Sequence, residues 1–147
     1  MSSTQDVNKN LVVRFNKEFV EGQNDSVYHE IVAEGFADHS APQGGPNAPF
    51  LFFTKIFRPA FPDAKVVIHD LVAEGDKVVA YKSYEGTHKG EFMGIPATGK
   101  SISFKVMEII RLQDGKYIDH WAVADAMGLL HQLKSDPVAA PTEKPRP

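Results

Sequence analysis

The chain has 147 residues, of which 42% are hydrophobic and 24% are charged, and it contains no cysteine. This length suits one domain, and the composition excludes disorder of the whole chain, disulfide scaffolds, thiolate metal sites and cysteine nucleophiles. The formal charge of −3 comes with no basic stripe for a nucleic-acid backbone. The N-terminus shows no signal-peptide pattern, and the most apolar short run, residues 50–53, is far too short to span a membrane. We expect a cytoplasmic protein without nucleic-acid or membrane partners.

The first part of the chain has the periodicity of helices. Apolar residues spaced three and four apart indicate amphipathic segments, which a loop rich in proline and glycine over residues 41–49 divides. The predicted elements are a helix over residues 4–22 capped by Ser3 or Thr4, a shorter helix from about Asp25 to Gly35, an extended segment over 36–39, and a helix over 47–58 capped by Asn47.

From residue 64 onward the pattern is typical of strands. Runs rich in Val, Ile, Tyr and Phe alternate with turn residues, and Asp114-Gly115 is a strong hairpin signal. The last segment, 135–147, is rich in proline, and we expect a flexible tail after a single domain over residues 1–134. The predicted elements are strands over 64–73, 77–87, 100–112 and 116–124, followed by a short helix over 126–133.

Helices followed by a run of strands are the layout of an α+β fold. Strands of this length coil strongly, so we expect a curved antiparallel sheet with the N-terminal helices packed on its concave face and a short C-terminal helix. Such a sheet leaves room for a pocket between its concave face and the helices, and any function depends on that pocket.

Glu108 is the clearest anomaly in the pattern. It lies in the middle of the more apolar face of the strand over 100–112, between Val106 and Ile110. Desolvation of a buried carboxylate raises its pKa toward the range that is useful for acid–base chemistry. The alternative is a structural carboxylate that a backbone amide, an arginine or a lysine satisfies.

His120 is the predicted partner of Glu108. It shares one face of the next strand with Ile118, Ala122 and Ala124, and the hairpin at 114–115 makes the two strands neighbours. A carboxylate beside an imidazole is an acid–base pair in which each group tunes the pKa of the other. The alternative is a core histidine with ordinary hydrogen bonds.

Other candidate site residues have simple structural alternatives. Asp125 is a third candidate for acid–base chemistry, but it is also a good N-cap for the terminal helix. Trp121 can line the pocket or pack in the ordinary way, and His39 and His88 can lie at the pocket rim or in exposed loops. The six histidines are scattered without metal-ligand spacing, so we expect no metal site.

Several segments of the chain resemble one known family. They are Phe36-Ala37-Asp38-His39, Gly86-Thr87-His88-Lys89-Gly90-Glu91-Phe92-Met93-Gly94-Ile95-Pro96, Ile109-Ile110-Arg111-Leu112-Gln113-Asp114-Gly115-Lys116, Asp119-His120-Trp121 and Gly128-Leu129-Leu130-His131-Gln132-Leu133. Together with Phe15 and Phe19 they are similar to the SnoaL-like polyketide cyclases of the nuclear-transport-factor-2-like superfamily. The resemblance extends over nearly all of residues 5–134. It implies a cone-shaped α+β barrel whose bent sheet and helices enclose a ligand cavity.

The resemblance also implies a function. Cyclases of this family close a ring by an intramolecular aldol condensation without cofactor or metal, and a base removes the proton next to a carbonyl. His88 and His120 match the family pattern, whereas Ala122 replaces the acid–base aspartate and Glu108 replaces a pocket histidine.

Two functions therefore stay open. The first is an acid–base enzyme, a cyclase, lyase or isomerase, that acts on a small hydrophobic carbonyl compound through Glu108, His120 and Asp125. The second is a non-catalytic module that binds a small ligand. In both, we expect His39, His88 and Trp121 to contact the ligand, together with the pocket residues Phe15, Phe53 and Ala122.

The outward face of the last two strands is partly apolar, which predicts self-association. It carries Ser103, Lys105, Met107, Ile109, Tyr117, Trp121 and Val123. An exposed, partly apolar sheet face of this kind is typical of a protein–protein interface, so we expect a homodimer or homotetramer.

Overall fold

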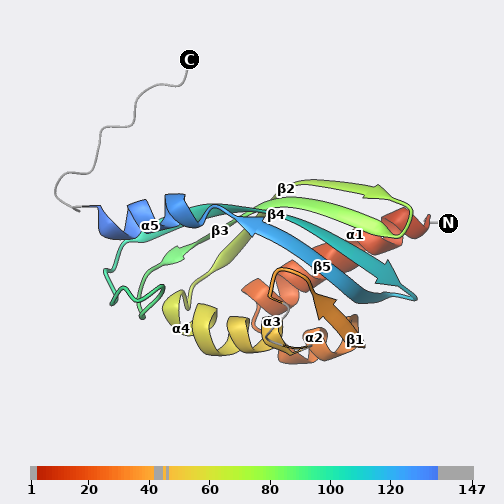
Figure 1. Ribbon diagram of the computed structural model, residues 1–147, viewed down its shortest axis with the longest axis horizontal. Helices are drawn as coiled ribbons and strands as arrows, with labels where there is room; N and C mark the ends of the chain where they lie inside the picture. The colour runs from red at the N-terminus through yellow and green to blue at the C-terminus, as the bar shows by residue number, and fades with distance from the viewer. Residues whose placement is uncertain (1–2, 42–44, 46, 136–147) are drawn as a thin grey trace, which may run out of the picture.

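The computed structural model describes residues 3–41, 45 and 47–135. In this part of the chain a curved sheet arches over a layer of helices (Figure 1). No helix in it is long and apolar enough to cross a membrane. The predicted flexible tail lies outside the described residues from residue 136 onward.

The observed elements follow the predicted order closely. The helical elements are α1 (Thr4–Arg14), η1 (Phe15–Glu21), α2 (Asp25–Ile31), α3 (Ala48–Leu51), η3 (Phe52–Phe57), α4 (Arg58–Ala60) and α5 (Ala126–Lys134). The strands are β1 (Val32–Asp38), β2 (Lys65–Glu74), β3 (Lys77–Thr87), β4 (Ser101–Gln113) and β5 (Lys116–Ala124). The α+β layout with a curved sheet, concave-side helices and a short C-terminal helix is therefore confirmed.

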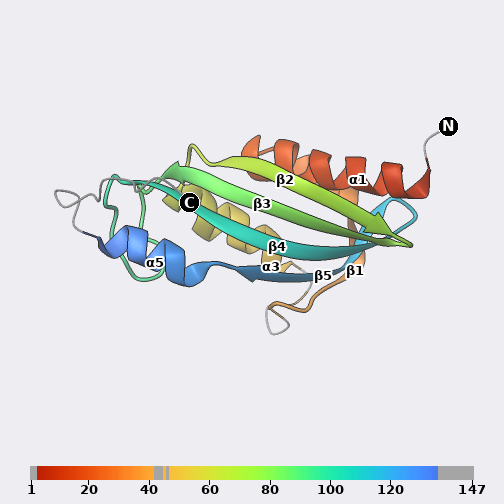
Figure 2. The ribbon, with the colours of Figure 1, turned by 90° about the horizontal axis from the view of Figure 1, so that it is seen from above.

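The helices begin and end where the caps and the packing require. Ser3 caps α1 by accepting a hydrogen bond from the Asp6 amide at 3.1 Å. The helix continues into the wider π-helical turn η1, and α1 runs along β2 and β3 (Figure 2). The helix predicted over 47–58 extends through α3, η3 and α4 to Ala60. Asn47 occupies the predicted N-cap position of α3, but its side chain forms no capping hydrogen bond.

The second helix ends earlier than predicted. It stops at Ile31 rather than Gly35, because Val32 already begins strand β1. This strand pairs in parallel with β5, with Asp38 beside His120, and the strand order is β1-β5-β4-β3-β2. The sheet is therefore open and contains one parallel pair at its edge, where the sequence predicted antiparallel pairing throughout.

A β-bulge in β5 changes which side chains face the core. Leu112 pairs with Tyr117 and Arg111 pairs with Asp119, so Ile118 is the extra residue. The bulge turns Tyr117 inward, and this residue is 3% exposed. Its predicted place on the outward face is wrong, because simple alternation does not anticipate a bulge.

Candidate functional site

Two opposite charges interrupt the apolar inner face of the sheet. In β4 every second residue from Ile102 to Leu112 is buried, and Glu108 belongs to this series with 6% of its surface exposed. In β3 the inward residues include Lys82, which is 2% exposed. Lys82 Nζ lies 2.6 Å from Glu108 Oε2. The pairing compensates much of the cost of burying either charge alone.

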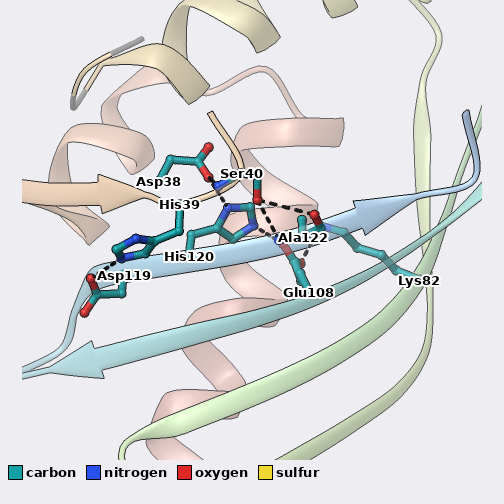
Figure 3. Close-up of polar contacts among 8 residues, drawn as sticks. All are labelled: Asp38, His39, Ser40, Lys82, Glu108, Asp119, His120 and Ala122. Carbon is teal, nitrogen blue, oxygen red and sulfur yellow. Dashed lines mark hydrogen bonds and ion pairs between the residues drawn. The ribbon is translucent and has the colours of Figure 1, made fainter. Parts of the chain in front are cut away.

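His120 lies between two carboxylates (Figure 3). Its Nε2 atom is 2.8 Å from Glu108 Oε1, and its Nδ1 atom is 3.1 Å from Asp38 Oδ1. Lys82 also donates a hydrogen bond to the buried Asn16 Oδ1 at 2.7 Å. These contacts form a continuous polar network from η1 across β3, β4 and β5 to β1.

The strand register brings these side chains together. Lys82 and His120 each lie diagonally across from Glu108 on the neighbouring strands, two residues from the position directly opposite it. Diagonal neighbours on one face are within reach of long side chains. Asp38 lies directly beside His120 in the parallel pair of β1 and β5. The predicted proximity of Glu108 and His120 is therefore observed.

Neighbouring charges shift the pKa of Glu108 in the direction opposite to the one that the sequence predicted. Burial alone raises it, but the Lys82 ammonium and the His120 ring hold the pKa of Glu108 down to about 2. Burial alone lowers the pKa of His120, but hydrogen bonds to Asp38 and Glu108 raise it to about 9. The pKa of Asp38 is lowered, against the effect of burial, chiefly by His120. At neutral pH this arrangement is two carboxylates and two cations, not a neutral carboxylic acid beside a neutral imidazole.

The network lines a cavity of about 350 Å³ between the sheet and the helices. This volume lies within the range of small-molecule sites. Phe52 and Phe53 line it from η3, and Phe104 lines it from β4. A pocket with mostly apolar walls and a few convergent charges suits a hydrophobic ligand that carries a polar group.

Three of the predicted ligand-contacting residues line this cavity, namely Phe15, Phe53 and Ala122. Trp121 does not, because it lies on the outward face of β5, and His39, which follows β1, packs against it on that face. There the two rings stack with their centroids 4.7 Å apart, and His39 Nε2 contacts Asp119 Oδ1 at 2.8 Å (Figure 3). Strand alternation separates them from the cavity.

The two remaining predicted site residues are also placed elsewhere. His88 is fully buried, but it packs near Phe61 and accepts a hydrogen bond from the Thr98 amide, and it does not line the cavity. Asp125 caps α5 by accepting a hydrogen bond from the Gly128 amide at 2.9 Å. The structural alternative for Asp125, the N-cap, is therefore observed, and Asp125 is not among the residues that line the cavity.

Sequence reasoning missed Asp38, Lys82 and Asn16 as members of the site. A signal existed for Lys82, since it interrupts the inward series of β3 just as Glu108 interrupts that of β4. Asn16 follows Val12 by four residues on the buried stripe of the first helix, which is a similar signal. Asp38 had no local signal, because its role depends on the pairing of β1 with β5.

The described residues contain no group of three or more histidines and acidic side chains placed to hold a metal ion. In the polar network, both ring nitrogens of His120 are already engaged by carboxylate oxygens.

Comparisons with known proteins agree with the fold and the cavity. The model of the SnoaL-like polyketide cyclases matches residues 10–133. The aklanonic acid methyl ester cyclase DauD from Streptomyces sp. (strain C5) is 28% identical over 133 residues, which cover 90% of this chain and 83% of that protein. AclR from Streptomyces galilaeus is 26% identical with a TM-score of 0.80, over 90% of this chain and 84% of that chain.

A third similar structure is TsrD from Streptomyces laurentii. Its TM-score is 0.81 at 23% identity, over 90% of this chain and 98% of that chain, which shows the shared fold. The family match extends over most of the chain and includes every strand of the sheet as well as the network around His120. The chain therefore belongs to the SnoaL-like polyketide cyclase family.

Proposed function

We propose that this protein is an acid–base enzyme that closes a ring in a small hydrophobic carbonyl compound held in the cavity. The observation that carries the proposal is the ionised network of Asp38, His120, Glu108 and Lys82 in an otherwise largely apolar cavity. Charged groups of this kind are costly to bury, and acid–base sites are where such perturbed groups gather. The similarity to a methyl ester cyclase supports the same reaction class.

The reaction needs one base and one acid. In an aldol ring closure the base removes a proton from the carbon next to a carbonyl, and the resulting enolate carbon attacks a second carbonyl. A carbon–hydrogen bond breaks, a carbon–carbon bond forms, and the second carbonyl oxygen takes up a proton to become a hydroxyl. The protein neither gains nor loses a proton overall.

Asp38 and His120 fit these roles best. Glu108 is held by both the Lys82 ammonium and the His120 ring, and its pKa of about 2 makes it a weak base. Asp38 is held by only one cation, His120, together with the Ser40 amide. In the proposal Asp38 takes the carbon-bound proton and His120 protonates the new alkoxide. The 3.1 Å contact between them then returns the proton from Asp38 to His120.

Glu108 and Lys82 act through His120 in this proposal. The carboxylate of Glu108 fixes the orientation of the imidazole ring and favours its protonated form. Lys82 in turn pairs with Glu108, and Asn16 accepts a hydrogen bond from Lys82. Glu108 thus keeps a place in the machinery that the sequence predicted, but as a positioning residue and not as the base.

A non-catalytic binding module is the second candidate. The observation that favours it is Ala122, which lines the cavity without any acid–base group. In that case the buried charges serve stability and ligand orientation alone.

The test measures proton abstraction and ring closure separately. The first readout is exchange of the α-protons of 2-tetralone in D₂O, followed by NMR, and the second is cyclisation of aklanonic acid methyl ester, followed by mass spectrometry. We expect the wild type to promote both. His120→Gln removes the acid that protonates the new alkoxide and is expected to lower the rate of cyclisation by about 100-fold to 10,000-fold.

The matched control is His39→Gln, which removes a histidine from the same strand pair but on the outward face. It is expected to leave both rates within about twofold of the wild type. Binding of both compounds to the wild type without exchange or cyclisation contradicts the enzyme proposal and supports the binding module.

We further propose that the protein works as a homodimer or homotetramer in the cytoplasm. Exposed apolar residues on the outward face of the sheet support the association, including Met107, Ile109, Trp121 and Val123.

A further inference from the structure

Tyr117 carries a polar group that the fold leaves unused. Two buried side-chain atoms in the described part of the chain have no hydrogen-bond partner, the Tyr117 hydroxyl and His88 Nε2. Of these two residues, only Tyr117 lines the cavity. Buried polar groups are nearly always paired in folded proteins, so an unpaired hydroxyl on a residue that lines a cavity requires an explanation.

The backbone of β5 is shaped to bring this residue inward. Without the extra residue Ile118, Tyr117 would share the outward face with Asp119. Bulges often re-aim a side chain next to a functional site. Inside, the ring packs against Phe15 with centroids 4.7 Å apart, a neighbour that offers the hydroxyl no partner.

The hydroxyl differs from the other polar groups that line the cavity near it. Lys82, Glu108, His120 and Asp38 are all engaged with one another, so a ligand gains a hydrogen bond from them only by weakening the network. Burial, with the negative charge of Glu108 as a second cause, raises the pKa of Tyr117 well above 10. The phenol therefore keeps its proton and is a hydrogen-bond donor.

We propose that Tyr117 donates a hydrogen bond to a carbonyl oxygen of the ligand and so selects ketones and esters over hydrocarbons of the same shape. The inference rests on the proposed function, because it concerns the same cavity. It adds a ligand-contacting residue from the start of β5. When the carbonyl becomes an enolate, its oxygen gains negative charge and this hydrogen bond becomes stronger, so the same contact stabilises the intermediate. No proton is transferred to or from Tyr117.

The experiment compares two tricyclic probes that differ by a carbonyl group, 9-fluorenone and fluorene. Binding of each is measured to the wild type, Tyr117→Phe and Tyr81→Phe, together with the carbonyl stretching frequency of bound 9-fluorenone. Tyr81 is the matched control, since it lies on the outward face of β3 against His69. Tyr117→Phe is expected to weaken binding of 9-fluorenone by about 3-fold to 10-fold, leave fluorene unaffected and raise the carbonyl frequency. Tyr81→Phe is expected to match the wild type in all respects.

Thermal unfolding separates this role from a structural one. Tyr117→Phe removes an unpaired hydroxyl and keeps the ring, so its melting temperature is expected to equal or exceed that of the wild type. Equal affinity for 9-fluorenone and an unchanged carbonyl frequency in Tyr117→Phe would overturn the inference. A lowered melting temperature together with an equal loss of affinity for both probes would overturn it as well, because it would show that Tyr117 has only a structural role in the core.

Failure of the proposed function gives a different result. If 9-fluorenone binds through Tyr117 but the wild type exchanges no α-protons of 2-tetralone, the inference stands and the enzyme proposal fails. If neither probe binds the wild type, both the inference and the ligand cavity are refuted.

Discussion

Two histidine–carboxylate contacts of the same length lie on opposite faces of β5. On the inner face His120 Nε2 is 2.8 Å from Glu108 Oε1, and on the outer face His39 Nε2 is 2.8 Å from Asp119 Oδ1. The inner side chains are 19% and 7% exposed, whereas the His39 side chain is 42% exposed. The inner ring also contacts a second carboxylate, Asp38. The contact distance alone therefore does not identify an acid–base group. Burial of the pair and the presence of further charged neighbours distinguish the inner contact from the outer one.

Strand alternation produces both contacts from adjacent residues. Asp38 faces inward and His39 outward at the end of β1, while His120 faces inward and Asp119 outward in β5. The parallel register of the two strands sets Asp38 beside His120. A shift of one residue would exchange the inner and the outer pair.

The largest expected effect comes from breaking the inner network. Lys82→Met leaves Glu108 without its ammonium partner, and we expect the free energy of unfolding to fall by about 3–5 kcal/mol. Denaturant titration measures this loss. The double variant Lys82→Met/Glu108→Leu is expected to recover much of it, because it removes the uncompensated charge.

The control for this variant is Arg111→Met on the outer face. Arg111 contacts Asp119 and Asp76 in an exposed position, where solvent screens the charges, so little stability is lost. Equal losses from Lys82→Met and Arg111→Met would contradict the distinction between the two faces.

A smaller effect is the pH dependence of stability. The pKa of His120 is raised from 6.5 to about 9, so its stabilising contribution is complete below pH 6.5 and is lost as the pH rises toward 9. We expect the free energy of unfolding to decrease over this interval with a slope of at most about 1.4 kcal/mol per pH unit. His120→Gln removes this slope.

The change in the free energy of unfolding at acidic pH reports less specifically on the inner network. The pKa of Glu108 is lowered from 4.5 to about 2, so its contribution is present above pH 4.5 and is lost as the pH falls toward 2. Carboxylates outside the network, such as Asp63, also have lowered pKa values, so the alkaline side is the informative one. If His39→Gln removes the alkaline slope and His120→Gln keeps it, the assignment to the inner face is wrong.

The smallest effect on stability is expected for Val123→Asp on the outer face. Val123 is 77% exposed, so the substitution should change the free energy of unfolding of the monomer by no more than about 0.5 kcal/mol. It places a charge in the proposed interface and is expected to shift the oligomer toward monomer in sedimentation at several concentrations. Ile56→Asp, an equally drastic change in η3, should leave the association unchanged. A wild type that is monomeric at every concentration would contradict the proposed assembly.

Much of the fold follows from local patterns in the chain. The predicted strand over 77–87 and the predicted start of the last strand at Lys116 agree with the structure, because the period-two alternation and the Asp114-Gly115 turn are local signals. The same alternation placed Glu108 on the buried face. Only the end of strand β1 was predicted, as the extended segment over 36–39, since its earlier residues are stabilised as a strand by pairing with β5 from the other end of the chain.

The sequence by itself determined the order of the elements, the family and the carboxylate and imidazole that meet in the cavity, because periodicity, turn residues and motifs are properties of short segments. The tertiary structure alone decided that Asp38 and Lys82 join them, that Tyr117 turns inward at a bulge, and that His39 faces outward and stacks on Trp121. The tertiary structure also decided that the pKa of Glu108 is lowered and not raised. Strand register and the balance between desolvation and neighbouring charges depend on residues far apart in the chain, and no local pattern contains them.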